Sequence, residues 1–381
     1  MNPDSVEARV ADAMAPYLES GSLPGYVAAV SIAGERRVLA AGLLGVGSGT
    51  AMEVDTVFRI ASLSKLVGAV LALILEERGT LSLEDEVAGW LPELAAPRVI
   101  REMDGPLDET VAVERPIIVR DLLTMTSGLG LVLTPGPLQA ALRAEGLMPG
   151  PFPPPFSHDE FMVRLGALPL VLQPGAGWLY HTGVDVLSVL MARAAGRSLG
   201  ELLAEEITGP LGLTSMAFHA TDLERFATAY TPSGDGLELL DLPSGRFSRP
   251  PRFETLGSGL VASAPDYLSF LEMLGRWGAP ILGAEAVRRM GSDQMTEHQR
   301  GTAQLFLGSG RSWGLGCEVV IGAGDTAIAP GAFGWMGGTG TSAYIDPGRE
   351  VAGVLFTQVA MPSNRPPPMF VDFWEAVYGE L

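Results

Sequence analysis

The chain has 381 residues, of which 47% are hydrophobic and 18% charged, so a disordered protein is excluded and two or three lobes can share a sizeable core. The net charge of −19 argues against nucleic acids and anionic membranes as partners. One cysteine excludes an internal disulfide framework, and the four scattered histidines lack metal-ligand spacing, so we expect neither a bound metal nor another cofactor.

The start of the chain carries neither a basic segment nor an apolar core, so we expect no signal peptide. The apolar run at residues 66–75 is too short to span a bilayer. These features favour a cytoplasmic protein without a membrane partner. The sequence does not indicate an oligomeric state.

Apolar residues recur at helical spacing over residues 4–20 and predict an amphipathic helix. Residues 26–32 and 37–41 are typical of two strands joined by a tight turn, and four glycines between residues 42 and 49 predict a loose loop. A phosphate-binding loop is disfavoured there, because no helix with a lysine follows directly.

Ser62 and Lys65, three residues apart, precede the apolar run at residues 66–75, which is typical of a buried helix. Both side chains then lie on one face at the mouth of that helix. Burial and the positive end of the helix dipole lower the pKa of such a lysine, and a neutral amine can take the proton of the serine. A lysine that reaches solvent from the helix end is the structural alternative.

Lys65 is the only lysine of the chain, and the other basic residues counted with it are arginines. Arginine cannot give up its proton in a protein, whereas a buried lysine can. A genome that favours arginine does not explain why this position keeps lysine. The exception therefore favours proton transfer at Lys65.

The middle of the chain alternates short helical patterns with turn-rich stretches. Helices are predicted at residues 83–91, 119–125, 158–166, 183–196 and 198–211. Residues 100–116 are polar and acidic and predict a surface excursion, while residues 220–255 are rich in turns. The proline-rich residues 148–156 cannot form a helix or a central strand, so they form either an inert connection or a wall of a pocket.

The last part of the chain predicts helices at residues 265–276 and 284–289, strands at 314–321, 341–345 and 351–358, and a closing helix at 370–378. With the two early strands these make a five-stranded antiparallel sheet, one face of which the terminal helices can cover. The fold class is therefore α/β (α+β). We expect a discontinuous α/β domain of residues 1–60 and 256–381, a mostly helical inserted domain of residues 61–255, and an active site in the cleft between them.

Two further segments carry candidate functional groups. Tyr180 comes just before a predicted helix and can present its hydroxyl to the cleft, or it is an amphipathic residue at the edge of a lobe. Residues 333–341 are glycine-rich and open a strand. Glycines there allow a ligand to approach the backbone closely, and the alternative is a plain turn.

Together, Ser62-x-x-Lys65, Tyr180 and Trp335-x-Gly337 resemble the serine β-lactamase and penicillin-binding-protein superfamily, for which Ser-x-x-Lys is a signature. Within this superfamily, the motifs are more similar to those of the class C β-lactamases, and most similar to those of their esterase relatives, the family VIII carboxylesterases. The resemblance covers nearly the whole chain. Further similar segments lie at residues 58–62, 119–129, 209–213, 257–260 and 354–358.

This resemblance implies a mechanism through an acyl-enzyme. Ser62 matches the nucleophile, Lys65 its activating partner and Tyr180 a second proton-transfer group. The backbone N–H groups of Ser62 and Gly338 match an oxyanion hole. The third motif of the family is matched by Trp335, Met336 and Gly337.

Two departures from the β-lactamase pattern favour esters over lactams. β-Lactamases usually carry Tyr-x-Asn, whereas Tyr180 is followed here by His181 and Thr182, which removes an amide suited to an amide substrate. Their third motif begins with lysine, whereas this chain has Trp335, and esterase relatives commonly have tryptophan or histidine there.

The sequence leaves several functions open. The leading hypothesis is a serine hydrolase that cleaves carboxylic esters, with a small-molecule ester or acyl compound as its partner. An acyltransferase uses the same acyl-enzyme and differs only in the attacking nucleophile. A D-amino-acid peptidase or a β-lactamase-type amidase is a further alternative on this fold, and an inactive binding protein is the alternative outside enzymes.

Overall fold

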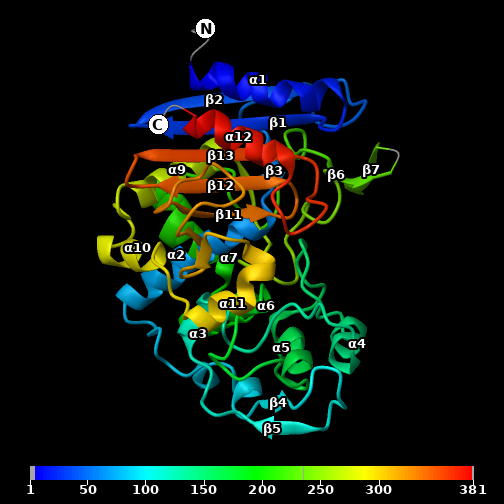
Figure 1. Cartoon of the computed structure of the whole chain (residues 1–381), viewed down its shortest axis with the longest axis vertical. Helices are drawn as coiled ribbons and strands as arrows, with labels where there is room; N and C mark the ends of the chain where they lie inside the picture. The colour runs from blue at the N-terminus through cyan, green and yellow to red at the C-terminus, as the bar shows by residue number, and fades with distance from the viewer. Residues whose placement is uncertain (1–4, 235, 380–381) are drawn as a thin grey trace.

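The computed structural model describes residues 5–234 and 236–379 and contains a seven-stranded antiparallel sheet toward one end of the molecule (Figure 1). Across the sheet, its strands are β2 (Glu35–Gly42), β1 (Gly25–Ile32), β13 (Val351–Thr357), β12 (Thr341–Asp346), β11 (Phe333–Gly337), β10 (Glu318–Val320) and β9 (Arg311–Trp313). Tyr26 pairs with Thr357, so the first and last strands of the chain are neighbours.

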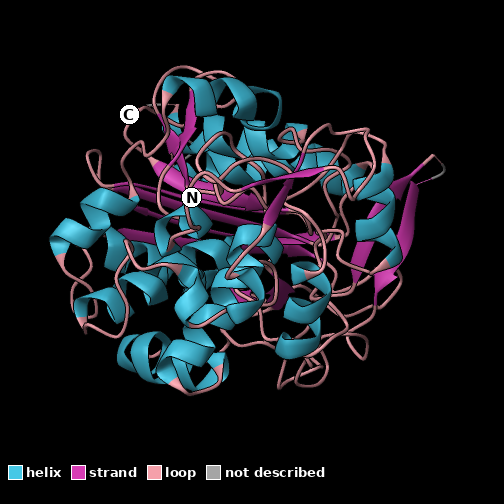
Figure 2. Ribbon diagram, turned by 90° about the horizontal axis from the view of Figure 1, so that it is seen from below, coloured by secondary structure: helices cyan, strands magenta, loops and turns pink. Residues whose placement is uncertain are grey.

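Helices lie on both sides of the strand layer (Figure 2). On one face, α1 (Val6–Glu19) packs beside α12 (Pro368–Tyr378), because Phe370, Phe373 and Trp374 share a core with apolar residues of α1. On the other face lies α9 (Ala264–Gly275). The buried apolar residues of α9 belong to the same hydrophobic core as those of the apolar helix α2 (Ser64–Glu77). The terminal helices therefore cover one face of the sheet, as the sequence predicts.

The predicted count of five strands is wrong. Residues 314–321 are not one strand, because β9 ends at Trp313, a tight turn follows, and β10 begins at Glu318. Gly316 in this turn has φ +74°, and a Cβ there would come within 2.7 Å of Ala69 in α2. The seventh strand is β11, which the sequence indicates only as a glycine-rich opening to a strand.

Most of the remaining elements surround α2 or extend to the opposite end of the molecule, whereas β6 (Ala229–Ser233) and β7 (Gly236–Asp241) lie beside the sheet (Figure 1). The helices are α3 (Val119–Leu123), α4 (Pro137–Ala144), α5 (His158–Gly166), α6 (Thr182–Ala195), α7 (Leu199–Leu203), α8 (Gly209–Leu211), α10 (Ala284–Met290) and α11 (Glu297–Leu307). Short antiparallel pairs join β3 (Val57–Arg59) with β8 (Val261–Ser263), β4 (Arg98–Ile100) with β5 (Thr110–Ala112), and β6 with β7.

Two helix predictions need correction. Residues 83–91 form only a 3₁₀ turn at Val87–Gly89, because backbone carbonyls of this segment accept hydrogen bonds from Val119 and Arg120 at the start of α3. In the other case, two helices have no counterpart among the predictions, namely α4 and, with a recognisable start, α11. The capping box of α11, in which Thr296 and Gln299 bond each other's backbone, is the signal that identifies this helix start.

No helix in the described part of the chain is long and apolar enough to cross a membrane. The division into a domain of residues 1–60 and 256–381 and a domain of residues 61–255 stays a prediction.

Close packing of β13 against α12 generates a stability prediction. A Cβ on Gly353 would come within 2.7 Å of the Trp374 indole, which is itself held by a hydrogen bond to Ser342. We expect Gly353→Ala to lower the free energy of unfolding by about 1–3 kcal/mol, measured by urea denaturation. Gly89→Ala is the matched control, because no atom lies within 4 Å of its new Cβ, and equal stability of the two variants would contradict this prediction.

Candidate active site

Ser62 lies in the 3₁₀ turn Ala61–Leu63 that leads directly into α2. Ala61, just before it, has a backbone φ of +42°, a conformation that residues other than glycine rarely adopt. The turn places Ser62 at the mouth of the helix, where its side chain borders a cavity. The nearby hydroxyl of Ser64 instead accepts a hydrogen bond from the Leu260 backbone inside the core.

The amine of Lys65 lies beneath Ser62 and is fully buried. Its Nζ donates a hydrogen bond to Ser62 Oγ at 3.0 Å and another to the carbonyl of Gly257, and it lies 3.3 Å from Nδ1 of His181. Burial lowers the pKa of Lys65 from 10.5 to about 7, although the negative charge of Asp185 raises it in part. A neutral amine at this distance can accept the proton of a serine hydroxyl.

An aromatic cluster holds Tyr180 over the same site. The indole N–H of Trp335 donates a hydrogen bond to the Tyr180 hydroxyl at 2.6 Å, and the Phe306 ring lies 4.5 Å from the tyrosine ring. Lys65 Nζ is 4.8 Å from the centre of the tyrosine ring. Burial raises the pKa of Tyr180 above its usual range, so the phenol keeps its proton at neutral pH.

The segment that carries Tyr180 makes a tight turn. The N–H of Thr182 bonds the carbonyl of Tyr180, and His181 between them has φ +85° and ψ −67°, which defines a strained γ-turn. Met125 holds this turn through two hydrogen bonds. Its carbonyl accepts a hydrogen bond from Leu179 N–H at 2.8 Å, and its sulfur accepts one from His181 N–H at 3.0 Å. The turn directs both ring side chains toward Lys65.

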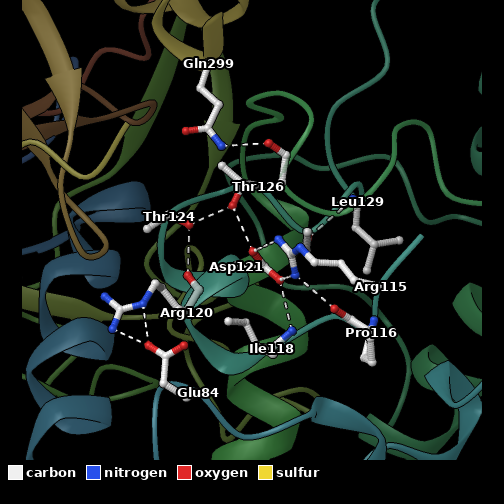
Figure 3. A network of polar contacts seen from close by, with 12 residues as sticks. Glu84, Arg115, Pro116, Ile118, Arg120, Asp121, Thr124, Thr126, Leu129 and Gln299 are labelled. Atoms are coloured by element: carbon white, nitrogen blue, oxygen red, sulfur yellow. Dashed lines mark hydrogen bonds and ion pairs between the residues drawn. The ribbon is translucent and has the colours of Figure 1, made fainter. Parts of the chain in front are cut away.

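A polar network centred on Asp121 anchors the segment that contains Met125 (Figure 3). The Asp121 carboxylate accepts two hydrogen bonds of 2.7 Å from Arg115 and one from the backbone N–H of Ile118. Thr126 also donates to this carboxylate, at 3.3 Å. Because Thr126 adjoins Met125, the network at α3 positions the turn at residues 179–182 indirectly.

The end of β11 approaches the segment before Ser62 closely. A Cβ on Gly337 would come within 2.4 Å of the Ile60 carbonyl, so this glycine allows backbone contact inside the protein rather than contact with a ligand. Thr341 donates to the same carbonyl at 3.2 Å. Gly338, the next residue along, borders the cavity. Ser62 and Gly338 therefore border the same cavity.

The cavity at Ser62 has a volume of about 240 Å³. Its lining includes Ser62, Tyr180, His181, Trp335, Met336 and Gly338 among the predicted site residues. Lys65 lies below the cavity floor, and Gly337 and Thr182 do not border it. Pro149 and Pro151 do border it, so part of the proline-rich segment forms a wall of this pocket.

A second cavity of about 170 Å³ adjoins the first and shares Leu131, Tyr180, Phe306 and Asn364 with it. Among the described residues, no Asp, Glu, Lys or Arg lines either cavity. Two important residues of this region were not predicted from the sequence. Phe306 comes from α11, which is distant in sequence from the motifs. Asp185 lies one helical turn after His181, and that spacing is a signal that could have identified it.

The segment Gly310-Arg311-Ser312-Trp313-Gly314 matches the Gly-x-Ser-x-Gly pattern of α/β-hydrolase nucleophiles. In those enzymes the serine lies on a sharp turn from strand to helix. Ser312 instead lies within β9, is fully buried, and donates its hydroxyl hydrogen bond to Asp293. This segment is therefore part of the sheet and not a second nucleophile.

Known proteins resemble the chain over nearly its whole length. The sequence model of the beta-lactamase family matches residues 10–369. Esterase EstB of Burkholderia gladioli is 31% identical over 98% of this chain and 96% of the esterase. The monacolin J acid methylbutanoyltransferase of Aspergillus terreus is 29% identical over 83% of this chain and 79% of the transferase. Among solved structures, EstCE1, described as a hydrolase with promiscuous acyltransferase activity, matches with a TM-score of 0.86 and 25% identity over 98% of both chains.

Proposed function

Because the chain belongs to the beta-lactamase family, we propose that it is a serine carboxylesterase that forms an acyl-enzyme on Ser62. The observation that carries this proposal is the 3.0 Å contact between Ser62 Oγ and the buried amine of Lys65, whose pKa is lowered to about 7. Nucleophilic catalysis by serine needs such an adjacent base.

In the proposed reaction, Lys65 takes the proton of Ser62 while Oγ attacks the ester carbonyl carbon. The N–H groups of Ser62 and Gly338 stabilise the negative oxygen that forms. As the bond to the alcohol breaks, Tyr180 donates a hydrogen bond to the leaving oxygen, and the proton held by Lys65 passes to that oxygen. Water then attacks the acyl carbon, and Lys65 accepts a proton from this water. Lys65 passes that proton to Ser62 Oγ as the bond between Oγ and the acyl carbon breaks, which releases the acid and restores Ser62.

The uncharged lining of both cavities supports a neutral substrate. A carboxylate bound in a buried site without a cationic partner is costly, whereas neutral acyl and alcohol groups pack well against indole and phenyl rings. Trp335 and Phe306 supply such rings at the cavity beside Ser62. The combined cavities can take an ester that is apolar on both sides of its carbonyl.

Acyl transfer is the second candidate, supported by the similarity to the Aspergillus terreus methylbutanoyltransferase and to EstCE1. The acyl-enzyme is the same in both reactions, and only the attacking nucleophile differs. An apolar cavity next to the acylated serine can hold an alcohol in place of water. Product analysis with and without an added alcohol separates transfer from hydrolysis.

The proposed substrate class is tested by comparing kcat/KM for a short neutral aryl ester with that for a chromogenic cephalosporin. We expect efficient cleavage of the ester and little or no ring opening, because no cationic side chain borders the described cavity to bind the cephalosporin carboxylate. Ser62→Ala is the control and should abolish ester cleavage. Comparable efficiency on both compounds would favour a β-lactamase instead.

The pH dependence of ester cleavage follows from the state of Lys65. Only its neutral amine can accept a proton, and burial lowers its pKa to about 7, so kcat/KM should rise as the pH is raised through about 7 and then level off. A pH profile with the neutral aryl ester measures this. His298→Asn, at an exposed position of α11, should give the same profile. A profile that is flat on both sides of neutrality would contradict this role of Lys65.

Substitution of Lys65 separates proton transfer from charge. Lys65→Arg keeps a positive charge but cannot deprotonate, so we expect kcat/KM to fall by about 10²–10⁴-fold. Lys65→Met removes the amine and keeps much of the apolar length, and it should be equally impaired. Thermal unfolding of both variants checks that they are folded. Substantial activity in folded Lys65→Met would make the residue structural.

A further inference from the structure

A closed ring of contacts lies behind the candidate nucleophile. Lys65 Nζ is 3.3 Å from Nδ1 of His181, whose Nε2 is 3.4 Å from an oxygen of Asp185. The other oxygen of Asp185 accepts from the Thr255 hydroxyl at 2.6 Å. Thr255 in turn accepts from the N–H of Gly257, whose carbonyl accepts from Lys65. Three segments of the chain, at residues 62–65, 181–185 and 255–257, thus meet at one amine.

The ring determines which nitrogen of His181 carries the proton. Burial by itself raises the pKa of Asp185, but His181, Thr255 and Lys65 together bring it below its usual range, so this group is a carboxylate. A carboxylate only accepts hydrogen bonds, and Nε2 of His181 must therefore be the N–H that faces it. Nδ1 then presents its lone pair to Lys65.

This arrangement also orients the amine. A neutral lysine has two N–H bonds and one lone pair. Two acceptors, Nδ1 of His181 and the carbonyl of Gly257, take the two N–H bonds. In the ammonium, the third N–H of Nζ donates to Ser62 Oγ at 3.0 Å; in the neutral amine, the lone pair takes that position and points at the hydroxyl proton.

We propose that His181 and Asp185 are positioning residues: they aim the lone pair of Lys65 at Ser62 and stabilise the ammonium once Lys65 has taken the proton. The inference rests on the proposed function, in which Lys65 is the base. The strained γ-turn at His181 supports it independently, because strained backbone persists where the surrounding structure holds it in place and is concentrated at functional sites.

Few charged groups surround His181 and Asp185. Lys65 and Asp185 are the charged groups that act on His181. Tyr180 lies beside it with its ring centre 5.7 Å away, and the more distant Glu318 acts on Tyr180 rather than on His181. Loss of the Asp185 charge should therefore act mainly on Lys65 and His181.

Because Lys65 is the only lysine, lysine labelled with ¹³C at Cε gives one NMR signal from this residue in the full chain. Asp185→Asn removes the negative charge that favours the ammonium, so the titration midpoint of this signal should move to lower pH by roughly one unit. His298→Asn, at an exposed position, should leave the midpoint unchanged. An unchanged midpoint in folded Asp185→Asn would overturn the inference.

A second measurement uses the rate at which a fluorophosphonate probe labels Ser62, which requires an activated serine but no ester substrate. We expect His181→Ala to label on the order of 10²-fold more slowly than the wild type. His181→Asn keeps an acceptor near the position of Nδ1, tolerates positive φ, and should recover part of the rate. Wild-type labelling by His181→Ala would overturn the inference even if Asp185→Asn fails to fold.

The two measurements also separate this inference from the proposed function. If the wild-type protein does not label at Ser62, the proposed function is wrong, while the NMR titration still shows whether Asp185 acts on Lys65. If Ser62 labels normally and neither variant changes the titration or the rate, only the positioning role is wrong.

Discussion

The buried amine of Lys65 is the constraint around which the rest of the site is organised. A charged lysine without water is costly, so its environment must either provide hydrogen-bond partners or leave it neutral. The protein does both. Ser62, Gly257 and His181 surround Nζ with three polar atoms, and burial lowers the pKa of Lys65 to about 7. An amine that loses its proton near pH 7 and is fixed in direction, as the proposed base must be, follows from this one burial.

Two of the three partners of Nζ, His181 and Gly257, come from parts of the chain distant from Lys65, and each is held by a further interaction. Asp185 and Thr255 link His181 to Gly257, and Met125 fixes the turn at His181 from below. Each link satisfies a polar group that would otherwise be buried without a partner. The contacts that satisfy these particular buried groups therefore also hold His181 and Gly257 around Lys65, which explains how a strained turn persists there.

The two adjoining cavities limit which compounds can reach Ser62. Their walls come from aromatic and aliphatic side chains and from the proline-rich segment, with no charged residue among the lining. Under the proposed function, such a lining favours neutral acyl compounds by packing and offers no cation to a substrate carboxylate. It does not by itself separate water from an alcohol as the second nucleophile, which agrees with the presence of both an esterase and an acyltransferase among the similar proteins.

The sequence alone predicted the α+β fold class and singled out Ser62, Lys65 and Tyr180 as candidate site residues, because motif spacing and apolar periodicity are local properties. It predicted five strands instead of seven, since the turn at Gly316 depends on close approach of α2, a contact between distant segments. It likewise could not place Phe306 at the cavity, nor join His181, Asp185 and Gly257 around Lys65. Those neighbours were decided by tertiary packing, because only the folded chain brings residues from three segments to one buried amine.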